Sequence, residues 1–121
     1  MHLDHIVISV SNLKRSIKFY NTFLGIGKAS SVDAYWVLGN TKLFLTKKYK
    51  ISAKKFDKHN FGLNHIAIKV DSLKKLKELI NKLDKAKIKH SSIISDKYNH
   101  LNKLTWFDDP DGIRLEFYYR K

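Results

Sequence analysis

The sequence predicts an α+β fold built from two βαβββ modules. The first observation is an internal repeat, because residues 2–25 align with residues 62–85 without a gap and are identical at eight of 24 positions. The second is hydrophobic patterning, which gives each half an alternating strand, an amphipathic helix and three further short strands. Between the halves, the lysine-rich stretch 48–61 has no periodicity and indicates a linker between modules at about 1–47 and 62–121.

The opening strand of each module has one apolar face. In the first strand Ile6, Ile8 and Val10 share this face, and residues 66, 68 and 70 repeat it in the second. The alternate positions, which include His5 and His65, therefore face away from the covering helix. Each helix follows a candidate N-cap, and the first ends at glycine. The residues concerned are Ser11 or Asn12, Asp71 or Ser72, and Gly25 with Gly27.

Short strands complete each module. In the first module we expect strands at about 28–32, 34–39 and 41–47, with a tight turn at Gly39-Asn40. In the second we expect strands at about 90–95, 103–108 and 113–119. The last two are joined by Asp-Asp-Pro-Asp-Gly at 108–112, which is a strong turn signal.

Length and composition set the broad class. A chain of 121 residues with 43% hydrophobic residues suits one compact domain with a packed core. The sequence has no cysteine, which excludes disulfides, zinc–thiolate sites and cysteine nucleophiles. The N-terminal apolar run is too short to span a membrane and lacks the basic start of a signal peptide, so we expect a cytoplasmic protein without a membrane partner.

The formal net charge of +13 raises the alternative of a nucleic-acid-binding module. However, only three of the 24 basic residues are arginine, namely Arg15, Arg114 and Arg120. Base readout favours the planar fork of arginine. Many of the lysines share a helix with apolar residues, as a solvated helix face would. A lysine-rich surface is therefore the favoured interpretation, and nucleic acid is disfavoured as a partner.

His5 and His65 occupy equivalent positions in the repeat, and they are the main candidates for chemistry. A lone strand histidine is usually a hydrogen-bonded structural residue, but a matched pair in a twofold arrangement favours convergence on one site. Glu116 is a third candidate ligand, with an ion pair to Arg114 or a surface lysine as the alternative. Two imidazoles and one carboxylate suit Fe, Mn, Ni, Co or Zn and leave positions open for substrate.

Three segments carry a family resemblance: HLDHIVISVSNLKRSIKFYNTFLG, GLNHIAIKVDSLKKL and FDDPDGIRLEFY. They resemble the vicinal-oxygen-chelate superfamily, which includes glyoxalase I, extradiol dioxygenases, fosfomycin-resistance enzymes and bleomycin-binding proteins. The resemblance covers nearly the whole chain. It implies an incompletely closed eight-stranded mixed β-barrel with flanking helices. It also implies ligand positions at His5, Phe44, His65 and Glu116.

Phe44 departs from the four-ligand pattern of glyoxalase I. Phenylalanine can neither bind a metal nor accept a proton, so the standard four-ligand reaction is not expected. His5, His65 and Glu116 match the three-ligand pattern of the dioxygenase and fosfomycin branches, although Val7 departs from the fosfomycin pattern. No branch fits throughout, and the reaction stays open between lyase, isomerase, transferase and dioxygenase.

Alternation along the strands predicts which other side chains face the substrate. Lys69 and Arg114 favour an anionic small molecule, with ordinary charge pairing as the alternative. His100 is a weak candidate acid or base in a loop, where a solvent-exposed histidine is the simpler interpretation. Alternation places Ser9, Phe44, Lys69, Arg114 and Tyr118 on the same faces as the candidate ligands. Trp36 and Trp106, on inner strands, complete the expected substrate-binding set as walls of the cavity, although the sequence does not fix which face each takes.

Two functions follow from these residues. The first is a metal-dependent enzyme acting on a small oxygen-bearing substrate. The second is a metal-free, drug-sequestering protein of the same fold that grips its ligand with aromatic side chains. The linker at 48–61 is long enough to join the modules within one chain or to exchange them in a homodimer, and both arrangements stay open.

Overall fold

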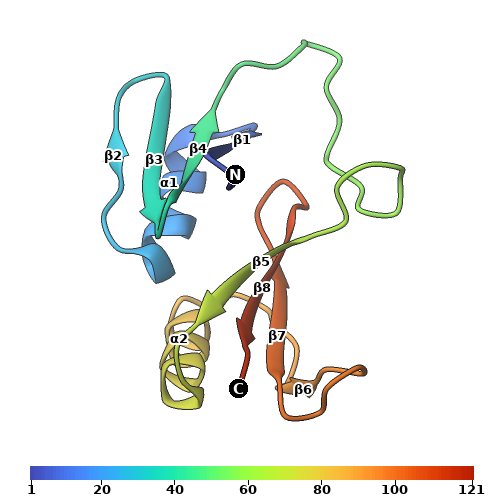
Figure 1. The fold of residues 1–121 in the computed structure, drawn as a ribbon. Helices are drawn as coiled ribbons and strands as arrows, with labels where there is room; N and C mark the ends of the chain where they lie inside the picture. The colour runs from blue at the N-terminus through green and yellow to red at the C-terminus, as the bar shows by residue number, and fades with distance from the viewer. The chain divides into compact units, whose positions relative to one another are not determined.

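The computed structural model describes residues 1–121, which divide into two compact units, Met1–Lys55 and Phe56–Lys121 (Figure 1). Each unit contains one βαβββ module, as the repeat predicts. The first comprises β1 (His5–Ser9), α1 (Leu13–Leu24), β2 (Lys28–Ala29), β3 (Asp33–Leu38) and β4 (Thr41–Thr46). The second comprises β5 (Ile66–Val70), α2 (Leu73–Lys85), β6 (Ile94–Ser95), β7 (Lys103–Asp108) and β8 (Arg114–Tyr119).

The strands form two four-stranded mixed sheets, ordered β1-β4-β3-β2 and β5-β8-β7-β6. In each sheet the first strand of the module pairs in parallel with the last, and the other pairs are antiparallel. The expectation of one eight-stranded barrel is corrected here, because the sheets are not closed into a barrel. Each first strand pairs with the last strand of its own module, so each sheet ends at its own edges.

One helix covers one face of each sheet. The N-cap side chains are Asn12 and Ser72, which accept hydrogen bonds from the backbone N–H groups of Arg15 and Lys75. Helix α1 ends at Gly25, whose φ of 82° favours glycine. The buried side chains of each helix and of the sheet that it covers form the cores. They are Ile8, Val10, Tyr20, Phe23, Ala34, Trp36, Leu43 and Leu45 in the first unit, and Val70, Leu76, Leu79, Leu83, Phe107, Ile113, Leu115 and Phe117 in the second.

Two of the four edge strands, β2 and β6, are shorter than the sequence predicts. The strand expected at 28–32 ends at Ala29, because the Ser30 hydroxyl accepts from the backbone N–H groups of Val32 and Asp33 and turns the chain. The strand expected at 90–95 is reduced to Ile94–Ser95, and His90 forms a separate bridge with Phe107. Local side-chain bonds compete with strand pairing at both edges.

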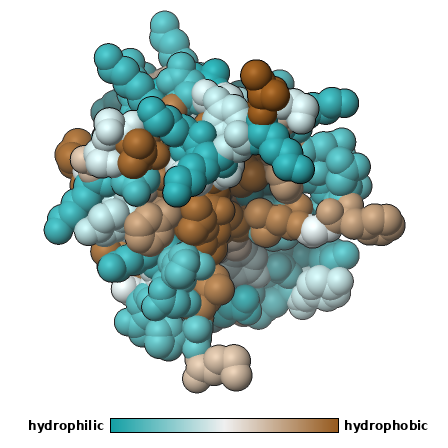
Figure 2. Space-filling view, turned by 90° about the horizontal axis from the view of Figure 1, so that it is seen from above, coloured by the Kyte–Doolittle hydropathy of each residue, from teal (hydrophilic) through white to brown (hydrophobic).

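The lysine-rich stretch between the modules is divided between the units at residues 55 and 56. The part of this stretch in the second unit, from Phe56 on, contacts the β7–β8 turn. The Phe56 N–H donates to the Asp111 carbonyl at 3.0 Å, and Lys58 Nζ lies 3.7 Å from Asp108 Oδ2. In Figure 2 hydrophilic side chains cover most of the visible face, and separate hydrophobic groups lie among them. Neither α1 nor α2 could cross a bilayer, because neither is sufficiently long and apolar.

Candidate functional site

His65 lies immediately before β5, and its ring is oriented by the preceding residue. The Asn64 amide nitrogen donates to the Lys58 carbonyl at 3.3 Å, which leaves the Asn64 amide oxygen facing His65 Nδ1 at 2.8 Å. An amide oxygen can only accept, so Nδ1 carries a proton and Nε2 is the ring nitrogen that faces Glu116. An outer hydrogen bond of this kind is the usual partner of a metal-binding histidine.

Glu116 on β8 faces His65. Its Oε2 lies 3.6 Å from His65 Nε2, and its side chain is only 14% exposed, against 41% for His65. Glu116 pairs in register with Ala67 on one side and Trp106 on the other, which places it on the sheet face that α2 does not cover. The alternative ion pair with Arg114 is not formed, because that guanidinium bonds to Asp108.

The first unit repeats this arrangement with one change. The His5 Nδ1 bonds to the Asp4 carboxylate at 2.6 Å, so its Nε2 is also the free nitrogen. Phe44 pairs with Val7 as Glu116 pairs with Ala67, which confirms that Phe44 and Glu116 are equivalent positions. The Phe44 ring lies edge-on to His5, with ring centroids 5.8 Å apart. A carboxylate in one sheet is therefore replaced by an aromatic ring in the other.

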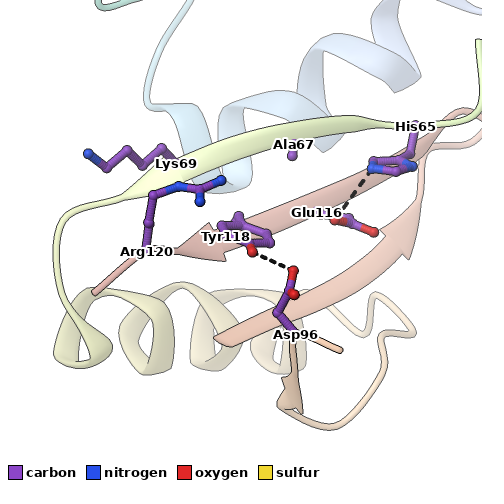
Figure 3. A pocket seen from close by; sticks show the side chains of 7 residues that line it. All are labelled: His65, Ala67, Lys69, Asp96, Glu116, Tyr118 and Arg120. Carbon is purple, nitrogen blue, oxygen red and sulfur yellow. Dashed lines mark hydrogen bonds and ion pairs between the residues drawn. The ribbon is translucent and has the colours of Figure 1, made fainter. Parts of the chain in front are cut away.

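A pocket of about 440 Å³ lies on the open face of the second sheet (Figure 3). His65 and Glu116 lie toward one end of it, and Lys69 and Arg120 lie toward the other. Ala67 lies on β5 between His65 and Lys69, and its short side chain does not fill the space between those two residues. The complete lining is His65, Ala67, Lys69, Asp96, Glu116, Tyr118 and Arg120.

The Tyr118 hydroxyl is fixed in this pocket by two partners. It donates to Asp96 Oδ2 at 2.5 Å and accepts from the Asn102 amide at 3.3 Å. The bond from Tyr118, followed by the backbone N–H groups of Tyr98 and Asn99, holds the pKa of Asp96 below its usual value. The same bond to Asp96 raises the pKa of Tyr118. Tyr118 is therefore a neutral, oriented group whose proton is already engaged.

Arg114 and Trp106 form a separate cluster on the same face. Burial disfavours ionisation of Asp108, but the bond and charge of Arg114, assisted by Lys58, outweigh it and lower the pKa of Asp108. The Arg114 guanidinium bonds to Asp108 at 2.8 Å and lies 3.9 Å from the Trp106 ring centroid. Arg114 is thus on the expected face, but its charge is paired.

Of the other predicted site residues, Lys69 lines the pocket as expected, whereas Trp36, Ser9 and His100 do not. Trp36 lies in the core, where its Nε1 donates to the Gly25 carbonyl at 3.0 Å, so it is away from the open face. The Ser9 hydroxyl donates to the Lys48 carbonyl, and His100 is exposed in the loop before β7.

Three residues on the open faces were not anticipated. Tyr35 pairs with Phe44 in register, and their ring centroids are 5.1 Å apart. Its equivalence to Trp106, which pairs with Glu116, could have revealed it from the repeat. Asp96 and Arg120 also line the pocket, and no sequence signal marks Asp96, because a loop brings it there.

The donor chemistry of His65 and Glu116 suits a divalent transition metal, since an oriented imidazole Nε2 adjoins a carboxylate. Within either unit, no group of three or more His, Cys, Asp or Glu side chains lies close enough to hold a metal ion. The second unit therefore contains two adjoining groups of the right kind, and His5 presents the same free nitrogen in the first.

Solved structures with the same fold span almost the entire chain. A glyoxylase/bleomycin resistance protein/dioxygenase domain from Frankia sp. EAN1pec is 23% identical, with a TM-score of 0.81 over 100% of this chain and 98% of that one. A putative glyoxalase from Bacillus halodurans is 25% identical, with a TM-score of 0.80 over 98% and 95%. A fosfomycin resistance protein from Listeria monocytogenes is 13% identical, with a TM-score of 0.74 over 100% and 94%.

Comparison with curated protein sequences gives no significant match. The family profile described as Glyoxalase/Bleomycin resistance protein/Dioxygenase superfamily, however, matches residues 2–117. That match includes both modules, both histidines and Glu116. The chain belongs to the glyoxalase/bleomycin resistance protein/dioxygenase superfamily.

Proposed function

We propose that this protein is a divalent-metal-dependent enzyme acting on a small oxygen-bearing substrate. His5, His65 and Glu116 would hold the ion, which would be Fe, Mn, Ni, Co or Zn. The observation that carries the proposal is the His65–Glu116 pair, with Nε2 facing the carboxylate at 3.6 Å and Nδ1 held by Asn64. The matching bond from His5 to Asp4 supports the inclusion of His5.

A bound divalent ion supplies Lewis acidity toward a substrate oxygen. The chain's own residues determine how the ligands are presented. Asn64 and Asp4 fix the two imidazoles as Nε2 ligands, and the low exposure of Glu116 favours pairing of its charge with a cation. Phe44 leaves no carboxylate at the position equivalent to Glu116, so that position has no base for proton transfer. Lyase, isomerase, transferase and dioxygenase reactions fit this set, whereas four-ligand glyoxalase I chemistry does not.

The same proposal covers the organisation of the chain. The two units would act together as one domain, because the family match spans both. They would combine either within one chain or by exchange in a homodimer, and the substrate would be a small molecule. A cytoplasmic location, expected from the sequence, belongs to the same proposal.

The proposal is tested by measuring bound metal in protein produced without a histidine tag. After exposure to each candidate ion and removal of excess, elemental analysis of the parent should give about one ion per chain. The double variant His5→Ala/His65→Ala should lose that ion, whereas the matched variant His59→Ala/His100→Ala should keep it. Metal well below one equivalent in the parent, or full retention in the first double variant, would contradict the metal site.

A second function is favoured by the open face of the first sheet. The Phe44 ring lies beside His5 and the Tyr35 ring lies beside Phe44, and Val7 and Val37 are 54% and 62% exposed. Such a surface suits an apolar or planar ligand, as a metal-free drug-sequestering protein would require. Binding of a planar aromatic drug that is undiminished by a chelator and lost in Phe44→Ala would support this function over the enzyme.

A further inference from the structure

The pocket of the second unit has two chemically different ends. Strands β5 and β8 run parallel, with Ala67 opposite Glu116 and Lys69 opposite Tyr118. His65 is therefore at the start of the pocket and Lys69 at its end, four residues further along β5. This spacing separates their Cα atoms by about 13 Å, from the rise of an extended strand. Arg120, just beyond β8, lies beside the Lys69 end (Figure 3).

The cationic end has two side chains, Lys69 and Arg120, that form no hydrogen bond or ion pair within the pocket. Arg120 lies 5.2 Å from the centroid of the Tyr118 ring, a contact that orients the guanidinium and leaves its N–H donors available. This contrasts with Arg114, whose donors are occupied by Asp108.

Neither acidic group of the pocket forms a hydrogen bond or ion pair with Lys69 or Arg120, although the charge of Arg120 helps to lower the pKa of Asp96. Asp96 already accepts the Tyr118 hydroxyl and the backbone N–H groups of Tyr98 and Asn99. Glu116 lies at the opposite end beside His65. Because the Tyr118 proton is donated to Asp96, Tyr118 cannot also donate to a ligand anion. Lys69 and Arg120 are therefore the groups in the pocket suited to bind one.

We propose that Lys69 and Arg120 form a subsite for the anionic group of a small acid, whose oxygen donors reach the His65–Glu116 end. The anion would be a carboxylate or a phosphate or phosphonate, since all offer several acceptor oxygens to the two cations. A volume of about 440 Å³ suits a small metabolite-sized acid. This assignment rests on the proposed function for the role of the opposite end, and it replaces Arg114 with Arg120 as the second cation.

The subsite is tested on the full chain with metal removed by a chelator, so that the anion cannot bind an ion instead. Inorganic phosphate, acetate and neutral acetamide are titrated at low salt while backbone amide chemical shifts are recorded. We expect phosphate and acetate to shift the amides around Lys69 and Arg120, and acetamide to shift none of them. The tighter of the two anions identifies the class of acid.

Two charge-matched double variants complete the test. Lys69→Gln/Arg120→Gln should weaken anion binding by about tenfold or more, as loss of two charge-assisted bonds implies. Lys77→Gln/Lys85→Gln removes the same charge from exposed positions on α2 and should change affinity by less than about twofold. Both replaced pocket residues are exposed, and an unchanged amide spectrum elsewhere verifies folding.

Equal affinity in the parent and Lys69→Gln/Arg120→Gln, or equal losses in both double variants, would overturn the subsite. Failure of the proposed function has a different signature, because metal would then be absent while anion binding persisted. Conversely, stoichiometric metal with no effect of Lys69→Gln/Arg120→Gln on anion binding would reject the subsite alone.

Discussion

The contact between Asp84 and His90 should make the stability of the second unit depend on pH. His90 Nε2 lies 2.6 Å from Asp84 Oδ1 at the end of α2, and its Nδ1 lies 2.6 Å from the Ser91 carbonyl. Both partners are acceptors, so both ring nitrogens are satisfied only in the protonated imidazolium. The bond to Asp84, then the bond to Ser91, raises the pKa of His90 above its ordinary value of 6.5, against the opposing effect of burial.

The direction of the effect follows from proton linkage. The folded protein binds the His90 proton more tightly than the unfolded chain does. The stabilisation of the folded state by protonated His90 is therefore complete below the ordinary pKa of 6.5. It is lost as pH rises through the raised pKa of the folded state. A charge-assisted hydrogen bond is worth about 1.5–3 kcal/mol. Because the Asp84 side chain is 60% exposed, solvent screening reduces the expected effect to about 1 kcal/mol.

The perturbation is Asp84→Asn. At pH 5.5 we expect it to lower the free energy of unfolding by about 1 kcal/mol, and at pH 9 by much less. Urea denaturation across this range measures the difference, and titration of the His90 ring by NMR should give a lower pKa in the variant. Glu78→Gln removes the same charge from the same helix and should show neither effect. A difference between parent and Asp84→Asn that is constant with pH, or an unchanged His90 pKa, would refute the reasoning.

Three further predictions concern packing and the candidate site. Gly27→Ala should lower the free energy of unfolding by about 1–3 kcal/mol in chemical denaturation, because an added Cβ would lie 2.5 Å from the Trp36 ring; an unchanged midpoint would show that the ring can move. Asn64→Leu should weaken metal binding by about 10–100-fold in calorimetry, since His65 loses its outer hydrogen bond. The control variant Asn64→Asp retains an acceptor for that hydrogen bond. Equal metal affinities in the two variants would contradict a positioning role for Asn64. The parent should show little or no glyoxalase activity toward a hemithioacetal after metal addition, since Phe44 replaces the carboxylate base, and rapid turnover would disprove that interpretation.

Much of the fold could be predicted because the repeat doubles the evidence for each element. The apolar alternation of residues 6–10 and 66–70 correctly separates the covered face from the open face, and the helix caps are among the predicted residues. The edge strands β2 and β6 were predicted too long, because the Ser30 and Ser91 hydroxyls accept hydrogen bonds from backbone N–H groups and interrupt the pairing. The hydrophobic periodicity of a sequence does not indicate where side-chain hydrogen bonds compete with strand pairing.

The candidate site was predictable where it depends on strand alternation and not where it depends on pairing partners. Alternation places Glu116 on the same face as Arg114, but it cannot show that Arg114 bonds to Asp108 and lies over Trp106. For Trp36 the facing direction could not be fixed from the sequence, and its register opposite Leu43 places it in the core. Arg120 lies beyond the last predicted strand, so alternation within strands did not include it.

The most direct test of the metal site is a zinc titration followed by long-range ¹H–¹⁵N NMR of the histidine rings. The chain has six histidines, so the four outside the proposed site act as internal controls. We predict that the Nε2 resonances of His5 and His65 shift together and reach completion at one equivalent of zinc per chain. A shift of His65 without His5, or of neither at one equivalent, would contradict the proposal that the two repeated histidines hold one ion.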